Sequence, residues 1–106
     1  MLKVTRIYTR PNVEIPWHGE VLLTRAVSDR LQYHRTGGVI LQENQEISLD
    51  GLTLTYTGYF QDQSTFDVYD TDPALQQFWN DRISYCNMVG ITIGPKQFDT
   101  VDSLPS

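Results

Sequence analysis

The sequence predicts an α+β fold in which four strands form one antiparallel sheet and two helices cover one of its faces. Three observations lead to this prediction: a central Asp50-Gly51 pair, strand-like alternation on both sides of it, and an amphipathic segment in each half of the chain. Asp-Gly between alternating apolar residues is a strong hairpin signal, because a type I′ turn needs a positive φ at both central residues. The predicted order is β-α-β-β-α-β in a single domain, residues 1–106.

The first half of the chain is expected to hold one strand and one long helix. Leu2–Thr9 is rich in the β-branched and aromatic residues that strands favour. Trp17–Arg35 repeats apolar side chains at helical spacing, and Gly37-Gly38 supplies a natural end for a helix. The residues on its predicted core face are Leu23, Val27, Leu31 and His34.

The two central strands, Val39–Leu49 and Leu52–Phe60, differ in how clearly they alternate. The first is apolar at its ends and polar in its middle, which indicates an exposed sheet edge or a bulge. The second alternates throughout, so one of its faces is apolar enough to join a core. The residues of its other face are Thr53, Thr55, Thr57 and Tyr59.

The second half of the chain repeats this plan. A capping-box pattern predicts a short helical turn over Ser64–Asp70. Asp72-Pro73 then starts a longer helix, Pro73–Val89, which Gly90 ends. The last strand is expected in two pieces, Ile91–Ile93 and Lys96–Val101, separated by Gly94-Pro95.

Composition excludes several classes of protein. The formal net charge is −5 and the pI about 4.7, which argues against a nucleic-acid partner, since such a protein needs a basic surface. No apolar run approaches the length of about 20 residues that a membrane helix needs, so no membrane partner is expected. The first residues, MLKVTRIYTR, lack the apolar region of a signal peptide, and the single Cys86 cannot form an intrachain disulfide. These features predict a cytoplasmic protein.

Right-handed crossovers place both helices on one face of the sheet, which is the ferredoxin-like arrangement. The opposite face would then carry Thr53, Thr55, Thr57 and Tyr59. A face with this much β-branched surface is rarely left fully in water. We therefore expect it to pair with the same face of a second copy, which makes a homodimer in which two sheets close into one barrel.

Three stretches of the sequence resemble the dimeric α+β-barrel superfamily, in particular its small members from marine bacteria and phages. They are the DGLTLT hairpin, the helix that starts at Asp72-Pro73 and contains Trp79 and Arg82, and the exit NMVGI at residues 87–91. The resemblance implies the fold and the dimer. The superfamily includes small monooxygenases, haem enzymes that act on dyes or chlorite, muconolactone-isomerase-like proteins and proteins without a known activity, so it does not define one function.

Of the two histidines, only His34 is a candidate site residue. His34 lies on the predicted core face, where it either packs with a hydrogen bond to a carbonyl group or serves as a general base or haem ligand in a pocket between helix and sheet. It is the candidate catalytic residue. His18 follows Trp17 at the helix start, where a surface or capping role is expected.

Arg82 is the other residue with two interpretations. Its stem can simply cover apolar surface, or its guanidinium can bind a carboxylate ligand. In the second case the ligand would lie in a pocket rimmed by Tyr56, Trp79 and Tyr85. Cys86, on the same helix, is expected to be a small buried apolar residue.

No pattern typical of a metal or cofactor site is present, so neither is expected. The aspartates before the second long helix do not follow a calcium-loop pattern, and capping explains Asp67 and Asp72. The sequence predicts a dimeric, non-catalytic binding or interaction module, for which Leu22 and Tyr33 lie off the core face. The alternative is a small cofactor-independent monooxygenase-like or isomerase-like enzyme that acts on a small aromatic or acidic molecule. A haem protein is a third possibility.

Overall fold

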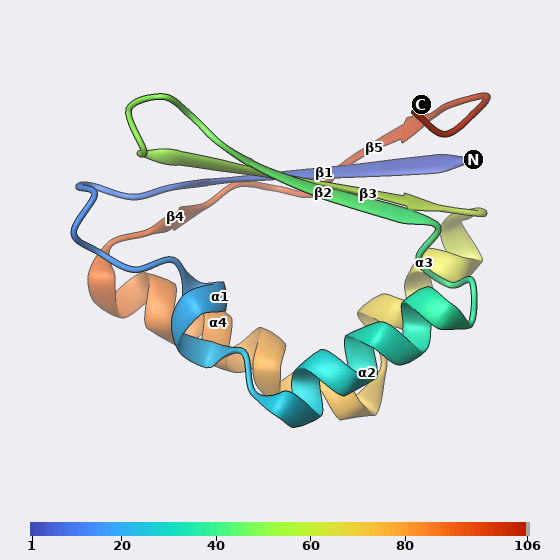
Figure 1. The fold of residues 1–106 in the computed structure, drawn as a ribbon, viewed down its shortest axis with the longest axis horizontal. Helices are drawn as coiled ribbons and strands as arrows, with labels where there is room; N and C mark the ends of the chain where they lie inside the picture. The colour runs from blue at the N-terminus through green and yellow to red at the C-terminus, as the bar shows by residue number, and fades with distance from the viewer. Residues whose placement is uncertain (106) are drawn as a thin grey trace.

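The computed structural model describes residues 1–105, which form one antiparallel sheet with all helices on one side of it (Figure 1). The strands are β1 (Leu2–Thr9), β2 (Gln42–Ile47), β3 (Thr53–Phe60), β4 (Thr92–Ile93) and β5 (Gln97–Thr100). The helices are α1 (His18–Leu22), α2 (Arg25–Thr36), α3 (Gln63–Asp70), the 3₁₀ turn η1 (Pro73–Leu75) and α4 (Gln76–Val89). The predicted α+β class is confirmed, with more helical segments than expected.

The sheet has the order β2-β3-β1-β4, and β5 also pairs with β1. β1 and β3 pair over their whole length, from Leu2 opposite Phe60 to Thr9 opposite Thr53. The last strand is in two pieces, as predicted. The amide of Gly94 donates to the carbonyl oxygen of Ile7 at 2.8 Å, and a Cβ at Gly94 would lie only 2.8 Å from that oxygen.

The core lies between the sheet and the helices in two clusters. One surrounds Phe60 and the other surrounds Leu54, so the predicted apolar face of β3 is the face that the helices cover. Cys86 is fully buried in the second cluster, as expected for a small apolar residue.

The single helix predicted over Trp17–Arg35 is wrong. The backbone is extended at Leu23 and Thr24, and the Thr24 hydroxyl accepts a hydrogen bond from the Val27 amide at 3.2 Å, which starts α2 anew. α1 has its own start, where the Glu20 carboxylate accepts from the Trp17 amide at 2.7 Å. The chain therefore turns between α1 and α2, and their side chains do not share one continuous stripe.

The central hairpin lies where it was predicted, but its turn is not type I′. Only Gly51 has a positive φ, of 77°, and Asp50 does not. The Gly51 amide donates to the Ser48 carbonyl oxygen at 2.9 Å, and the Asp50 carboxylate accepts from the Leu52 amide at 3.0 Å. The longer loop leaves β2 shorter than the predicted strand Val39–Leu49.

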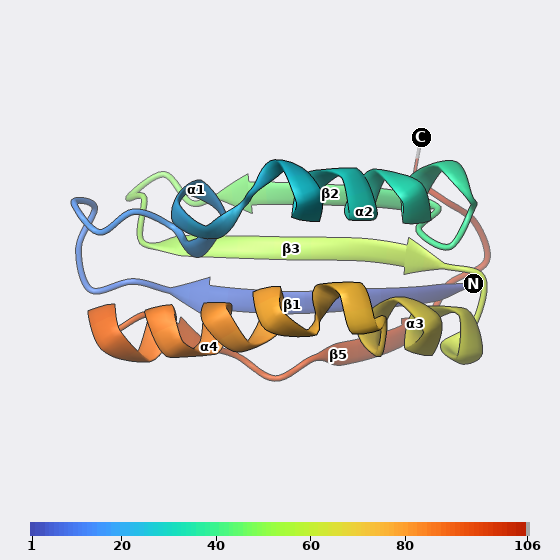
Figure 2. The ribbon, with the colours of Figure 1, turned by 90° about the horizontal axis from the view of Figure 1, so that it is seen from below.

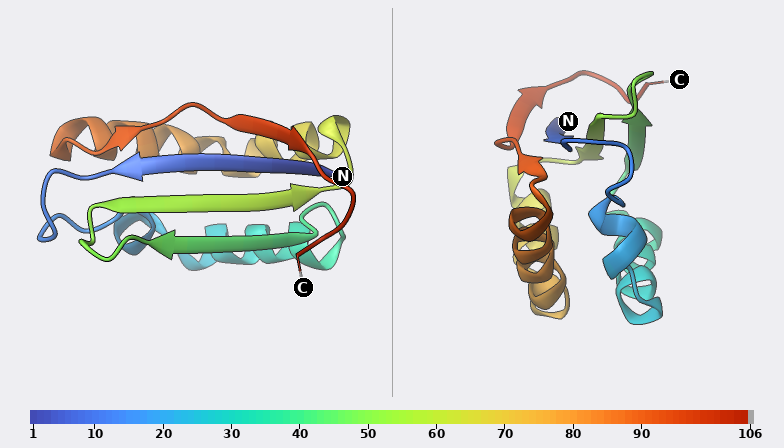
Figure 3. Two further views of the ribbon diagram at one scale, coloured as in Figure 1. Left: turned by 90° about the horizontal axis from the view of Figure 1, so that it is seen from above. Right: turned by 90° about the vertical axis from the view of Figure 1, so that its left-hand side faces the viewer.

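The helices form two rows that run side by side on the same face of the sheet (Figures 2 and 3). One row, α1 and α2, runs along β2 and β3, whereas α4 and α3 run along β1 and β5. The other face of the sheet carries no helix, and the end of the chain turns back across its edge (Figure 3). Ile7 lies on this open face, in register with Thr55, and is 37% exposed.

Candidate functional site

A cavity of about 430 Å³ lies between the two helical rows, with β1 and β3 as its floor. Its size falls in the range of small-molecule sites. Most of its lining is aromatic or aliphatic, with polar groups at two ends. Trp17 and Leu23 line one side, Phe78 and Trp79 the other, and Leu54 the floor.

Arg82 of α4 dominates one end of the cavity. Its Nη1 donates to the Tyr8 hydroxyl at 3.1 Å, and its guanidinium carbon lies 4.8 Å from the centre of the Trp79 ring. Its Nε and the Nε1 of Trp79 are both buried and have no hydrogen-bond partner. Together with Nε1 of Trp17, three buried donors of cavity-lining residues are thus left without an acceptor, which is costly unless a ligand supplies one.

Arg6 of β1 adds a second positive charge at this end. Its Nε donates to the Gly94 carbonyl oxygen at 3.0 Å, and burial, reinforced by the charge of Arg82, lowers its pKa. Within residues 1–105, neither Arg6 nor Arg82 forms an ion pair, whereas the nearby Asp70 pairs with Lys96 at 2.9 Å. The cationic end therefore has no carboxylate of its own that is free to balance it.

His18 lies beside these two arginines. It is 8% exposed, its ring centre lies 4.5 Å from that of Tyr8, and its Nδ1 lies 3.9 Å from the Cys86 sulfur. Burial and the charges of Arg82 and Arg6 lower its pKa from 6.5 to about 4. His18 is thus neutral at pH 7, and burial also raises the pKa of the Cys86 thiol, which stays protonated.

At the other end of the cavity, the polar side chains Glu43, Tyr56 and Arg35 are already linked by hydrogen bonds. Glu43 accepts from the Tyr56 hydroxyl at 2.8 Å and from Arg35 at 2.7 Å. Burial holds the pKa of Tyr56 well above its usual value, so its hydroxyl remains a donor. This end can orient a ligand but does not require a charged one.

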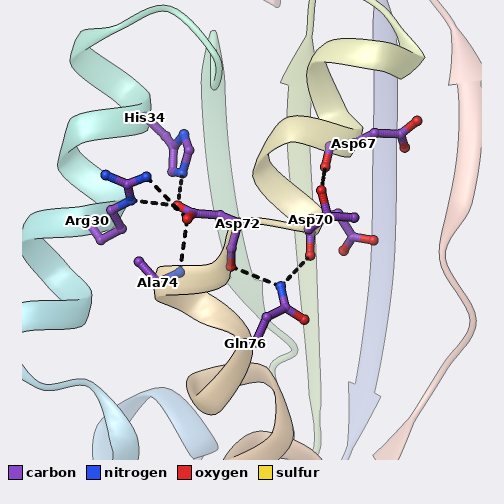
Figure 4. A network of polar contacts seen from close by, with 8 residues as sticks. Arg30, His34, Asp67, Asp70, Asp72, Ala74 and Gln76 are labelled. Atoms are coloured by element: carbon purple, nitrogen blue, oxygen red, sulfur yellow. Dashed lines mark hydrogen bonds and ion pairs between the residues drawn. The ribbon is translucent and has the colours of Figure 1, made fainter.

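His34 does not line the cavity, so of its two expected roles it has the packed, hydrogen-bonded one, with a carboxylate as partner instead of a carbonyl group. Its Nε2 lies 2.6 Å from Oδ2 of Asp72, a carboxylate that is only 4% exposed (Figure 4). Arg30 reaches the same carboxylate with two hydrogen bonds of 2.6 and 3.2 Å, and the Ala74 amide donates at 3.0 Å. Hydrogen bonds from Arg30 hold the pKa of Asp72 well below its usual range. This cluster joins α2 to η1, and its carboxylate is paired within the protein.

The structure brings only some of the predicted pocket residues together. Tyr56, Trp79 and Arg82 line the cavity. Tyr85 does not, because its hydroxyl donates to the Pro16 carbonyl oxygen at 2.7 Å, outside the lining. The surface or capping role expected for His18 is wrong, because its side chain is 8% exposed and lines the cavity. Sequence reasoning also missed Arg6, although a charged residue on the apolar face of Leu2–Thr9 was a usable signal.

The described residues offer neither a metal site nor a membrane helix. No group of three or more His, Cys, Asp or Glu side chains within residues 1–105 is placed to hold a metal ion. In the same range, no helix has the length and apolar character needed to cross a bilayer.

The fold, rather than the sequence, connects this chain to known proteins. No protein-family model matches it, and no curated protein is significantly similar in sequence. A similar structure from Deinococcus radiodurans has a provisional description as an antibiotic biosynthesis monooxygenase; it is 12% identical with a TM-score of 0.66, over 100% of this chain and 97% of the other. A dimeric ferredoxin-like protein from an uncultured marine organism is 9% identical with a TM-score of 0.59, over 97% of both chains.

A third similar structure is that of Rv0793 from Mycobacterium tuberculosis, which is 14% identical with a TM-score of 0.54, over 100% of this chain and 98% of the other. The fold is thus that of ferredoxin-like α+β proteins. Identities this low establish the fold alone.

Proposed function

We propose that this protein binds a small aromatic acid as its anion in the cavity between the two helical rows. The observation that supports this most directly is the buried, unpartnered Nε of Arg82 at the cavity wall. The net charge of the chain is −5, yet one end of the cavity holds two guanidinium groups that form no ion pair within residues 1–105. This end of the cavity therefore attracts anions although the protein as a whole is acidic. The aromatic lining suits a flat ligand.

The chemistry of the cationic end selects the ligand class. A guanidinium fork binds planar oxyanions through charge-assisted hydrogen bonds, which are stronger than neutral ones. The Trp79 indole supplies a further donor on the same wall. A neutral ligand of the same shape would fill the cavity and leave Arg82 Nε unsatisfied, so we expect the anion to bind more tightly.

Binding of para-nitrobenzoate tests this proposal, with quenching of tryptophan fluorescence or calorimetry as the readout. Replacement of Arg82 by Gln should weaken binding by about 1.5–3 kcal/mol, the value of a hydrogen bond to a charged group, or about 10- to 150-fold in Kd. The neutral para-nitrobenzamide should bind the native chain more weakly than the acid.

A matched control is Arg25→Gln. Arg25 lies on α2, its side chain is 95% exposed, and it does not line the cavity. Its replacement changes the net charge of the protein by the same amount and should leave the Kd unchanged. Equal losses in both variants would show that only overall charge matters and would refute the site.

The open face of the sheet supports the second part of the proposal, a homodimer. By the alternation of β3, Thr53, Thr55, Thr57 and Tyr59 face away from the helices, with Ile7 in register with Thr55; Tyr59 is already only 8% exposed within the single chain. The name of the similar marine protein describes it as dimeric. Light scattering at micromolar concentration should give twice the mass of the chain, and Thr55→Arg should shift it toward the monomer, because like charges would meet across the two-fold axis.

A small cofactor-independent enzyme of the monooxygenase or isomerase kind is the second candidate function. It is favoured by His18, a neutral imidazole next to two cations in the same cavity, where a proton can be removed from a ligand. Oxygen uptake or isomer formation with small phenols, lost in an Arg82→Gln variant, would support it. Tight binding of the acid without turnover would favour the binding module.

A further inference from the structure

We propose that His18 accepts the proton of a phenolic or enolic hydroxyl group on the bound ligand, which then remains in the cavity as an oxyanion beside Arg82 and Arg6. This inference rests on the proposed function, since it specifies the acid as a weak hydroxyl acid rather than a carboxylic acid. In this step the ligand O–H bond breaks and an N–H bond forms at Nε2 of His18. No electron is transferred.

The geometry assigns the acceptor atom. Nδ1 of His18 faces the sulfur of Cys86 at 3.9 Å, deep between α1 and α4. In the tautomer that carries its proton on Nδ1 and directs it to that sulfur, the lone pair of the neutral ring lies on Nε2, and this is the tautomer that the proposal requires. No side chain of residues 1–105 hydrogen-bonds to Nε2, and His18 is part of the cavity lining, so this nitrogen is the one that a ligand can reach.

The surrounding charges make the transfer depend on the ligand. Tyr8 and Arg6 of β1 and Arg82 and Cys86 of α4 face His18, and Glu20 lies on its own helix, where it caps Trp17. Both guanidinium groups oppose protonation of His18 in the empty cavity. An oxyanion placed beside them offsets their field at the imidazole, so the ligand that donates the proton also creates the conditions that keep it on His18.

The other titratable groups of the cavity are poor acceptors. The cavity lining holds three carboxylates. The Glu43 carboxylate already accepts from Arg35 and Tyr56, the Asp70 carboxylate is held by Lys96, and the Glu20 carboxylate accepts from the Trp17 amide. The Tyr8 hydroxyl accepts from Arg82, and burial raises its pKa, so it remains protonated. His18 is therefore the neutral base at the cationic end.

para-Nitrophenol is the probe for this inference, because its phenolate and phenol forms absorb at different wavelengths. We expect the bound probe to absorb as the phenolate at a pH where the free probe is mostly neutral. Its pKa in the site should be lower by about 1–2 units. Calorimetry in buffers of different ionisation enthalpy should show that no proton is released to solvent, because the proton moves to His18.

Replacement of His18 by Gln should raise the pKa of the bound probe, so that the phenolate band is lost at the same pH. para-Nitrobenzoate is already an anion and needs no acceptor, so its Kd should change less than about threefold in this variant. Release of one proton per probe bound by the native chain would overturn the inference even if the variant did not fold, since the proton would then go to the buffer.

The outcomes separate this inference from the proposed function. If para-nitrobenzoate binds and para-nitrophenol binds only as the neutral phenol, the anion site stands and the role of His18 is refuted. If neither probe binds, the proposed function fails and this inference fails with it. If the phenolate band persists unchanged in His18→Gln, the arginines alone stabilise the anion and His18 is not the acceptor.

Discussion

Two polar clusters in this chain each combine a buried histidine with arginine, but only one of them also contains a carboxylate that pairs with the arginine. In the first, His34 and Arg30 meet at the carboxylate of Asp72, which the Ala74 amide also binds (Figure 4). In the second, His18 lies beside Arg82 and Arg6, and no carboxylate of residues 1–105 pairs with either arginine. The first cluster closes the contact between α2 and η1, and the second opens into the cavity.

The difference shows how to separate structural histidines from candidate functional ones. A buried cation that has its own carboxylate holds two elements together and gains nothing from a ligand. A buried cation without one, next to an empty volume, is stabilised when an anion arrives. The presence of Asp72 in one cluster, and of no equivalent acid in the other, is thus more informative than either histidine alone.

The largest effect should come from breaking the complete cluster. Replacement of Asp72 by Asn keeps the shape of the side chain but leaves Arg30 and His34 without their anion. We expect a loss of about 3 kcal/mol in the free energy of unfolding, near the lower end for a broken buried pair because Arg30 is partly open to water. Urea denaturation measures this loss.

Asp67→Asn is the control for that variant. Asp67 lies in the same region of the chain but is exposed, and its carboxylate accepts only from Gln63 among the side chains of residues 1–105, at 3.0 Å. Its replacement should change stability by less than about 0.5 kcal/mol. A loss as large as that of Asp72→Asn would mean that general charge, not the cluster, stabilises this region.

The second prediction uses the pH dependence of the incomplete cluster. The pKa of His18 is lowered from 6.5 to about 4 in the fold, so the unfolded chain binds a proton first as the pH falls. The contribution of neutral His18 to the free energy of unfolding is therefore complete above pH 6.5 and is lost as the pH falls toward 4. We expect a loss of about 1–2 kcal/mol, less than the full shift would give, because water reaches part of the ring.

Urea denaturation at a series of pH values checks this expectation. His18→Gln should flatten the slope between these pH values, and Arg25→Gln should keep it. Asp72 acts at lower pH: the pKa of its carboxyl group is depressed in the fold, so its contribution is present above the usual pKa of about 3.9 and is lost below it. A slope that persists in His18→Gln would place the titrating group elsewhere.

Local signals in the sequence were sufficient for much of the fold. Gly90 has a positive φ of 86° and ends α4 at the predicted place, and Asp72 caps η1 just before Pro73. The alternation of β3 gave the correct face to the core because the period of a strand fixes it. What failed was the helix over Trp17–Arg35, where apolar spacing continues through Thr24 although the backbone breaks there.

That break explains why the site was only partly predicted. A continuous helix puts His34 and Leu23 on one stripe facing a pocket, whereas the turn after Leu22 gives α2 its own phase and directs His34 to Asp72. It also lays α1 against α4, which buries His18 beside Cys86. Both placements depend on contacts across 38 and 68 positions of the chain, which no local pattern contains.

Of these predictions, the smallest effect on stability is expected for Arg82→Met, and the contrast of this variant with Arg30→Met compares the two clusters directly. Methionine keeps much of the apolar stem and removes the charge. The lost hydrogen bond to Tyr8 costs stability, while removal of a buried cation without an acid partner restores it, so we expect a net change below about 1 kcal/mol. Arg30→Met, by contrast, should destabilise the fold, because it strips a buried carboxylate of its main partner.

Urea denaturation of both variants, together with para-nitrobenzoate binding, tests the contrast. Arg82→Met should fold normally and bind the acid about 10- to 150-fold more weakly, which is the signature of a residue retained for a ligand at little benefit to stability. If Arg82→Met instead unfolded as readily as Asp72→Asn, Arg82 would be a structural residue like Arg30, and the cavity would lose the feature that marks it as an anion site.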